Sequence, residues 1–117
     1  MGILKVRKEQ DGITVVGCEP GTALDAANSG ELRERAGEML GGSPRLVFDM
    51  GGVEFVDSSA IGALVGLLRS ARDSGGDVRL ARVGGDVRTI LELTRLDSVF
   101  GIYPSVEEAV RSFRTAP

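Results

Sequence analysis

The chain has 117 residues, of which 26% are charged and 42% hydrophobic, and this is the size and composition of one globular domain with its own core. The net charge is −3, arginines occur singly and aromatic residues make up only 4%, so neither an electrostatic track nor a stacking surface for nucleic acid is predicted. The sequence contains no histidine, which removes the commonest general base and the Ser-His and Cys-His nucleophile pairs and argues against a hydrolase.

The first part of the chain predicts a hairpin followed by a helix. Residues 4–9 and 13–16 have the pattern of two short strands, and Gln10-Asp11-Gly12 between them is a turn signal. Residues 17–21 include Pro20 and predict an edge or a bulge, because proline cannot donate to a sheet. A helix is predicted from Asn28 or Ser29 through residue 40, where a glycine pair ends it.

Residues 46–73 are the stretch around which we expect the fold to be organised. An apolar run interrupted only by Asp49 predicts a strand with both faces covered. A glycine pair then predicts a loop, and after Asp57 the apolar residues recur at helical spacing. Asp57, Ser58 and Ser59 stand at the start of this helix, where an acceptor side chain can satisfy the free amides of the first turn. The pattern leaves open which of the three is the N-cap.

The segment 60–68 of this helix contains no charged residue. Because a sheet can cover only one side of a helix, the segment predicts an apolar flank near Ser58 that a partner protein could cover. Gly62 and Gly66 lie four residues apart on one side of the helix, where either the sheet or another protein could approach closely, and of the two we favour internal packing.

The last third of the chain predicts two further strand and helix pairs. A strand over 78–83 precedes a helix that Asp86 can cap, and a short strand over 99–103 precedes a helix with Ser105 and Glu108 as its capping box. The whole order, β-β-α-β-α-β-α-β-α, predicts an α/β fold. We expect a single domain over residues 1–117, with a mixed, mostly parallel β-sheet of about five strands and four helices.

Cysteine and hydropathy patterns indicate the compartment. Cys18 is the only cysteine, which excludes an internal disulfide and a zinc site built on cysteine pairs, and we interpret it as a small buried residue. No apolar run approaches the roughly 20 residues of a membrane span, and the N-terminus lacks the pattern of a signal peptide. We expect a cytoplasmic protein with no metal, no cofactor and no contact with membranes.

Three segments, taken together and in this order, resemble the STAS domain of bacterial anti-sigma factor antagonists. The strongest is LVFDMGGVEFVDSSAIGALVGLL at 46–68, where the family has a strand, a loop ending in Asp-Ser-Ser or Asp-Ser-Thr, and an apolar helix. The others are VRTILELTRLDSVFGIYPSVEEAV at 87–110 and, more weakly, TALDAANSGEL at 22–32. The similarity extends over nearly the full length of the chain.

The resemblance implies a protein of transcription regulation and stress response that is not an enzyme. Such proteins bind an anti-sigma factor that is also a serine kinase, and so release the sigma factor. The kinase phosphorylates the serine after the Asp, which abolishes binding, and a metal-dependent serine phosphatase reverses the modification. The matching serine is Ser58, with Ser59 as the alternative. The partner-binding residues implied are Asp25, Asp57, Ser58, Ser59, Ala60, Ile61 and Gly62.

Three features depart from the family pattern. Ala60 and Arg95 stand where the family usually has glycine, and residues 18–21 resemble a small insertion on the side used for docking. The first departure bears on affinity for the partner, and the insertion bears on which partner is selected.

Two other interpretations are considered. Asp49 could be the acceptor of a phosphorylation receiver domain, but that fold needs a lysine late in the chain, and the lysines here are Lys5 and Lys8. The second alternative keeps the STAS fold and makes the protein an unphosphorylated scaffold or binding subunit of a stress-sensing complex or a lipid-transport assembly. Phosphorylation of Ser58, or its absence, distinguishes this alternative from the partner-switching hypothesis.

Overall fold

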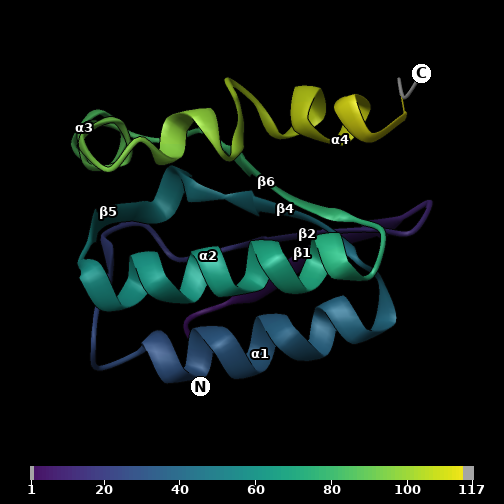
Figure 1. Ribbon diagram of the computed structural model, residues 1–117, viewed down its shortest axis with the longest axis horizontal. Coiled ribbons are helices and arrows are strands. Elements are labelled where there is room, and N and C mark those ends of the chain that lie inside the picture. The colour runs from purple at the N-terminus through teal and green to yellow at the C-terminus, as the bar shows by residue number, and fades with distance from the viewer. Residues whose placement is uncertain (1, 115–117) are drawn as a thin grey trace.

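The computed structural model describes residues 2–114, and for residues 8–10 the backbone alone. Figure 1 shows helices on both sides of a central sheet. In chain order the described elements are β1 (Lys5–Gln10), β2 (Ile13–Gly17), β3 (Thr22–Leu24), α1 (Ser29–Gly42), β4 (Arg45–Asp49), the 3-10 turn η1 (Met50–Gly52), β5 (Val53–Val56), α2 (Ser58–Asp73), β6 (Asp77–Ala81), α3 (Gly85–Leu93), the 3-10 turn η2 (Leu96–Ser98), β7 (Gly101–Tyr103) and α4 (Val106–Arg114).

The main sheet has the strand order β1-β2-β4-β6-β7. Strands β1 and β2 are antiparallel, and every other neighbouring pair in this sheet is parallel. The hairpin turn is made by Asp11 and Gly12, whose φ angles of 55° and 75° suit a two-residue turn of the primed type. The described part of the chain therefore confirms the predicted α/β fold with a mixed sheet of five strands and four α-helices.

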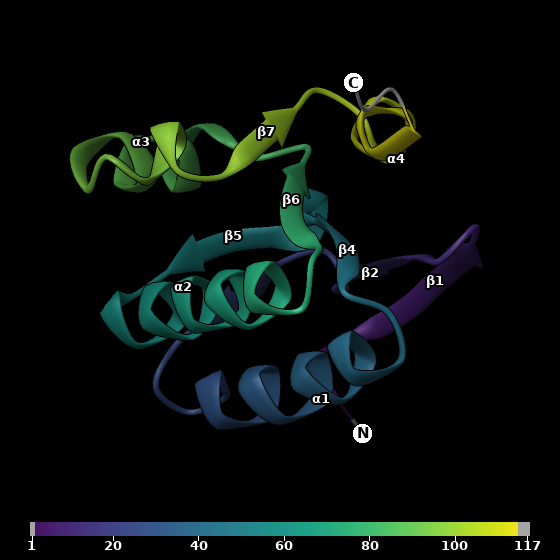
Figure 2. The ribbon, with the colours of Figure 1, turned by 45° about the vertical axis from the view of Figure 1, so that its right-hand side comes forward.

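Both faces of β4 are covered, which explains why its three central residues, Leu46, Val47 and Phe48, are all apolar. Leu46 and Phe48 belong to the larger core, together with residues of α1, α2 and α3. Val47 belongs to a second cluster that contains Ala109 and Phe113 of α4. Figure 2 shows α1 and α2 on one side of the strands and α4 on the other. Alternate residues of β4 thus serve different cores, as expected of a parallel strand with two covered faces.

A second sheet of two parallel strands, β3 and β5, was absent from the sequence prediction. In it Ala23 pairs with Phe55 and Leu24 pairs with Val56. These strands are only three and four residues long, too short for a clear alternation of apolar and polar residues. Their pairing brings the segment before α1 against the segment before α2, and this positions the candidate site.

The segment between β2 and β3 leaves the main sheet before Pro20 is reached. It packs closely on η1, since a Cβ added to Gly52 would collide with the carbonyl oxygen of Cys18. Glycine is needed at that position because only a bare backbone can approach another backbone so closely.

Two details of the C-terminal half bear on the predicted caps. The helix predicted to be capped by Asp86 has Gly84 as its N-cap and makes no side-chain cap bond, so that prediction was wrong; Asp86 lies in the first turn. The predicted cap of α4 is present, because the amide of Glu108 donates to Ser105 Oγ at 3.1 Å. Arg95, at a position where the resemblance implies glycine, has a φ of 61°, the left-handed conformation that glycine adopts most easily.

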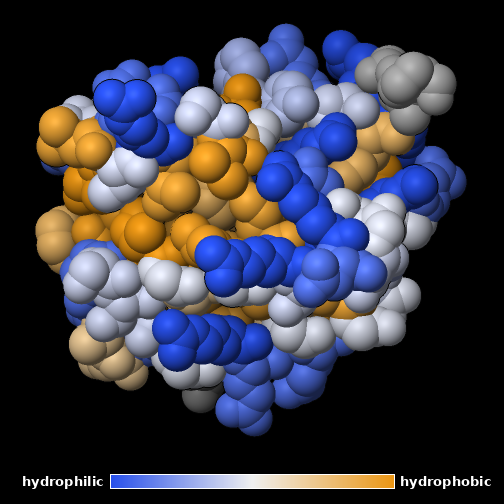
Figure 3. All heavy atoms as spheres, in the orientation of Figure 1, coloured by the Kyte–Doolittle hydropathy of each residue, from blue (hydrophilic) through white to orange (hydrophobic). Residues whose placement is uncertain are grey.

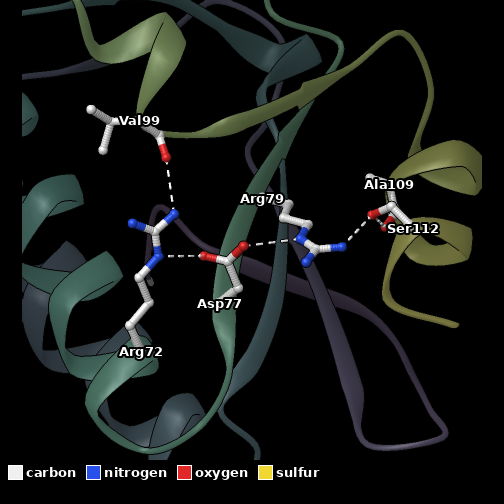
Figure 4. A network of polar contacts seen from close by, with 6 residues as sticks. All are labelled: Arg72, Asp77, Arg79, Val99, Ala109 and Ser112. Carbon is white, nitrogen blue, oxygen red and sulfur yellow. Dashed lines mark hydrogen bonds and ion pairs between the residues drawn. The ribbon is translucent and has the colours of Figure 1, made fainter. Parts of the chain in front are cut away.

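Charged side chains tie the far end of α2 to the C-terminal elements (Figure 4). Asp77 at the start of β6 accepts from Arg72 Nε at 3.1 Å and from Arg79 Nε at 3.0 Å. Arg79 in turn donates to Ser112 Oγ at 2.7 Å, and Arg72 donates to the carbonyl of Val99 at 3.0 Å. The network joins α2, β6, α4 and the residue that follows η2, at the end of α2 opposite to Ser58, so we assign it to the stability of the fold.

Candidate functional site

The N-cap of α2, which the sequence left open, is Asp57. Its Oδ1 accepts from the amide of Ala60 at 3.0 Å, inside the first turn of the helix. Its Oδ2 accepts from the amide of Ala26, 31 residues earlier in the chain, also at 3.0 Å. The Asp57 carboxylate therefore caps α2 and also holds the loop between β3 and α1 against the start of α2.

Ser58 and Ser59 take no part in this cap. Ser58 is exposed and is the first residue of α2, and Ser59 is half-buried. Neither hydroxyl makes a hydrogen bond with any residue in the 2–114 range. Because Asp57 supplies the side-chain cap and the Ser58 hydroxyl makes no hydrogen bond with the described residues, the exposed Ser58 can be modified without the loss of a structural bond.

Asp25, which the resemblance implies as a partner-binding residue, lies beside this junction. The amide of Asp57 donates to the carbonyl of Leu24 at 3.1 Å, which continues the pairing of β3 with β5 up to the site. The carboxylate of Asp25 accepts from the amide of Ala27 at 3.0 Å, and Asn28 Oδ1 accepts from the amide of Asp25 at 2.9 Å. Asp25 and Asp57 thus build one rigid corner from two loops.

The next turn of α2 divides the remaining predicted partner-binding residues. Ala60 is 0% exposed and part of the core, so its side chain is not available to a partner. Ile61 is half-buried and Gly62 is exposed. The interpretation of Gly62 and Gly66 as internal packing positions was wrong, because both face outward and a Cβ on Gly66 would meet no atom within 4 Å.

An apolar surface borders the site, but it is only partly the flank predicted on α2. Figure 3 shows apolar atoms gathered between α2 and α3, in the region of β5. The exposed or half-buried large apolar side chains on these three elements, which we call the α2–α3 apolar surface, are Phe55, Ile61, Val65, Ile90 and Leu93. The most exposed are Phe55, at 49%, and Leu93, at 79%. Most of the uncharged segment 60–68 is core.

Sequence reasoning missed Phe55 because it missed β5. The only signal for it was an aromatic residue two positions before Asp57, in a stretch that we predicted as loop. Phe55 lies in β5 among other exposed apolar side chains, and a contiguous apolar surface of this kind indicates a contact site.

Asp49, considered above as a phosphate acceptor, is a buried anchor. The carboxylate is 2% exposed, and its Oδ2 accepts from Arg7 at 3.0 Å and from Arg82 at 3.1 Å. Its Oδ1 accepts from the amide of Gly51 at 2.9 Å. These contacts join β1, β4 and the end of β6, and they indicate a structural role.

Cys18 is fully buried, and burial raises the pKa of its thiol from 9.0 to about 11. Only the thiolate attacks a disulfide reagent, and at pH 8 this shift lowers the thiolate fraction about a hundredfold. We expect Cys18 in the folded protein to react with an aromatic disulfide at least that much more slowly than in the urea-unfolded chain, measured by absorbance.

We further expect Cys18→Ser to bind partners like the parent under reducing and oxidising conditions, because a single cysteine has no resolving partner for an internal disulfide. A loss of binding on oxidation of the parent alone would reveal a redox input and contradict the assignment of a structural role.

Among residues 2–114 no group of three or more Cys, His, Asp or Glu side chains could hold a metal ion. Over the same range, none of the helices is long and apolar enough to cross a membrane.

Comparisons with known proteins agree on one family. The family model of the STAS domain matches residues 5–109. A candidate anti-sigma factor antagonist of Thermotoga maritima is 37% identical over 62 residues, which are 53% of this chain and 55% of that protein. The candidate anti-sigma factor antagonist BtrV of Bordetella bronchiseptica is 27% identical over 107 residues, which are 91% of this chain and 90% of that protein.

The fold is also found among solved structures. The crystal structure of a candidate anti-sigma factor antagonist from Thermotoga maritima superposes with a TM-score of 0.81 at 28% identity, covering 92% of each chain.

Proposed function

The chain belongs to the STAS domain family, and we propose that it is an anti-sigma factor antagonist whose partner is an anti-sigma factor with serine kinase activity. In this proposal the unmodified protein binds the kinase, the sigma factor is released, and phosphorylation of Ser58 ends the binding. The observation that carries the proposal is the free, exposed hydroxyl of Ser58 on a helix that Asp57 already caps. The protein acts by binding and not by catalysis, in the cytoplasm.

The surroundings of Ser58 support docking of a protein at this end of the molecule. The corner made by Asp25 and Asp57 is rigid, because each carboxylate accepts amide hydrogen bonds within the two loops. The α2–α3 apolar surface lies beside it, and large contiguous apolar patches are uncommon on protein surfaces that bind nothing. We propose that the kinase covers Ser58, Ile61, Gly62 and the α2–α3 apolar surface together.

Phosphoryl transfer at this site needs no rearrangement of the antagonist. The exposed hydroxyl is accessible to the kinase, and a helix N-terminus favours the negative charge that the modification adds. A metal-dependent serine phosphatase would then hydrolyse the exposed phosphate ester and restore the binding form. Ser59 is the less suitable acceptor because it is half-buried.

The contribution of the α2–α3 apolar surface to kinase binding is tested by the variant Phe55→Asp. We expect this variant to lose at least tenfold in affinity for the kinase, because a carboxylate replaces half-exposed apolar area that docking would bury. The thermal midpoint should change little, since the side chain is already 49% exposed in the free protein. Isothermal titration calorimetry against the kinase measures the affinity.

Val6→Asp on β1 is the matched control, because Val6 is 47% exposed and lies on an element outside the α2–α3 apolar surface. Equal losses for the two variants would show that the effect is one of charge and not of the proposed docking surface.

The proposal as a whole is tested by mass spectrometry. Incubation with ATP and the anti-sigma factor kinases of the same organism should add one phosphate, on the peptide that contains Ser58. The protein purified from its own cell should carry the same modification in part of the population. If no kinase modifies either serine and none binds the protein, the scaffold interpretation replaces this one.

A further inference from the structure

Arg33 of α1 lies against the turn of α2 that follows Ser58. The two helices pack together and run in the same direction, so that their N-termini lie at the same end of the molecule (Figures 1 and 2). Arg33 is one turn into α1 and Gly62 is one turn into α2. A Cβ placed on Gly62 would be 3.6 Å from Nη2 of Arg33, so the guanidinium lies over this glycine.

The guanidinium has no carboxylate partner there. Arg33 is exposed, and its guanidinium makes no hydrogen bond or ion pair with any other residue that the structure describes. The positions three and four residues away along α1 are held by serine, alanine and two glycines, so no acid on the same helix face can pair with it. The positive charge is available to an anion that appears nearby.

Ser58 is the residue whose modification would supply that anion. It precedes Gly62 by four residues, and side chains at this spacing lie on the same face of a helix with their Cβ atoms about 5–6 Å apart. Because Gly62 has no side chain, the guanidinium can lie over this position of α2, one turn from Ser58.

We infer that Arg33 binds the phosphate of phosphorylated Ser58, an inference that rests on the proposed function. The phosphate brings about −1.5 to −2 charges and three acceptor oxygens, and a guanidinium can donate two parallel hydrogen bonds to such a group. Arg33 thereby offsets the repulsion from the Asp57 carboxylate, which is fixed next to the modified residue. The phosphorylated antagonist holds its own phosphate in place between α1 and α2.

The test uses protein with phosphoserine incorporated at position 58 during synthesis, without any kinase. The titration midpoint of the phosphate is followed by phosphorus NMR. A nearby cation favours the dianion, so we expect Arg33→Gln to move the midpoint upward by about 0.2 to 0.7 pH units, the size of a solvent-exposed ion pair. Arg33→Lys, which keeps the charge and loses the planar fork, should give a smaller change.

Two controls make the result specific. Arg69→Gln removes an exposed arginine of α2 that lies about 16 Å further along the helix, and it should leave the midpoint unchanged. Phosphoserine placed at position 59 points to another side of the helix, and its titration should not respond to Arg33→Gln.

An unchanged midpoint in Arg33→Gln, or an equal response from phosphoserine at position 59, would overturn the inference. Because the phosphate is built in during synthesis, a kinase that fails to modify Ser58 would count against the proposed function and would not alter this measurement.

Discussion

Ser58→Asp is expected to lose at least a hundredfold in affinity for the anti-sigma factor kinase while keeping its circular dichroism spectrum. In the free protein the new carboxylate stays in water and meets the favourable end of the α2 dipole, an effect of about 0.3 to 1 kcal/mol. The Asp57 carboxylate beside it acts in the opposite direction. The Ser58 hydroxyl makes no hydrogen bond with the described residues, so the substitution removes no side-chain hydrogen bond from the fold.

The bound state is different because docking would remove water from the charge. A carboxylate or phosphate that is buried beside the α2–α3 apolar surface without a cation from the partner costs several kcal/mol, and Arg33 does not remove this cost because its own guanidinium would lose water in the same step. About 1.4 kcal/mol corresponds to a tenfold change in affinity, so a hundredfold loss is the lower bound of the expected effect. Phosphorylation would therefore act by blocking docking and not by refolding the antagonist.

Calorimetric titration of the kinase with Ser58→Asp and with Ser58→Ala measures this difference. The alanine variant should bind and resist phosphorylation. Ser70→Asp is the charge-matched control, because Ser70 is an exposed residue near the other end of α2. If Ser58→Ala were still phosphorylated and Ser59→Ala were not, Ser59 would be the acceptor.

Asp49→Ala should destabilise the fold by about 2 to 4 kcal/mol. The substitution removes the shared acceptor of Arg7 and Arg82 and leaves the amide of Gly51 without its partner. The arginine side chains are 41% and 53% exposed and can turn to water, which keeps the cost below that of a fully buried pair. Asp49→Asn retains an oxygen for Gly51 and should lose less.

Urea unfolding monitored by circular dichroism gives the free energies. Glu92→Ala is the reference, because its ion pair with Arg88 is exposed on both sides and such pairs contribute about 0.5 kcal/mol or less. An Asp49→Ala variant no less stable than Glu92→Ala would show that the two arginine contacts do not hold β1 and β6 to β4.

Much of the candidate site could be located before the structure was known. The Asp-Ser-Ser junction stands between a loop and a strongly periodic apolar helix, and both signals lie within a few residues of one another. The choice of N-cap could not be made in this way. Asp57 was selected by a second hydrogen bond, to the amide of Ala26, and that bond depends on the fold.

The surface near Ser58 was harder to predict for the same reason. An uncharged helix reveals that it is buried on one side, but it does not reveal how many elements cover it. In the structure α1 as well as the sheet packs on α2, so the predicted flank is mostly core and the exposed apolar residues include Phe55 and Leu93 of neighbouring elements.

The sequence by itself determined the α/β class, the hairpin at Asp11 and Gly12, the four helices and the position of Ser58. Each of these depends on periodicity, turn chemistry or motif order within a short segment. Only the tertiary structure decided that β3 pairs with β5, that the serines are free of the cap, and that Arg33 lies over Gly62. These features join residues some 30 positions apart in the chain, as in the bond from Ala26 to Asp57, and local propensity carries no information about which distant segment a short strand or an exposed arginine will meet.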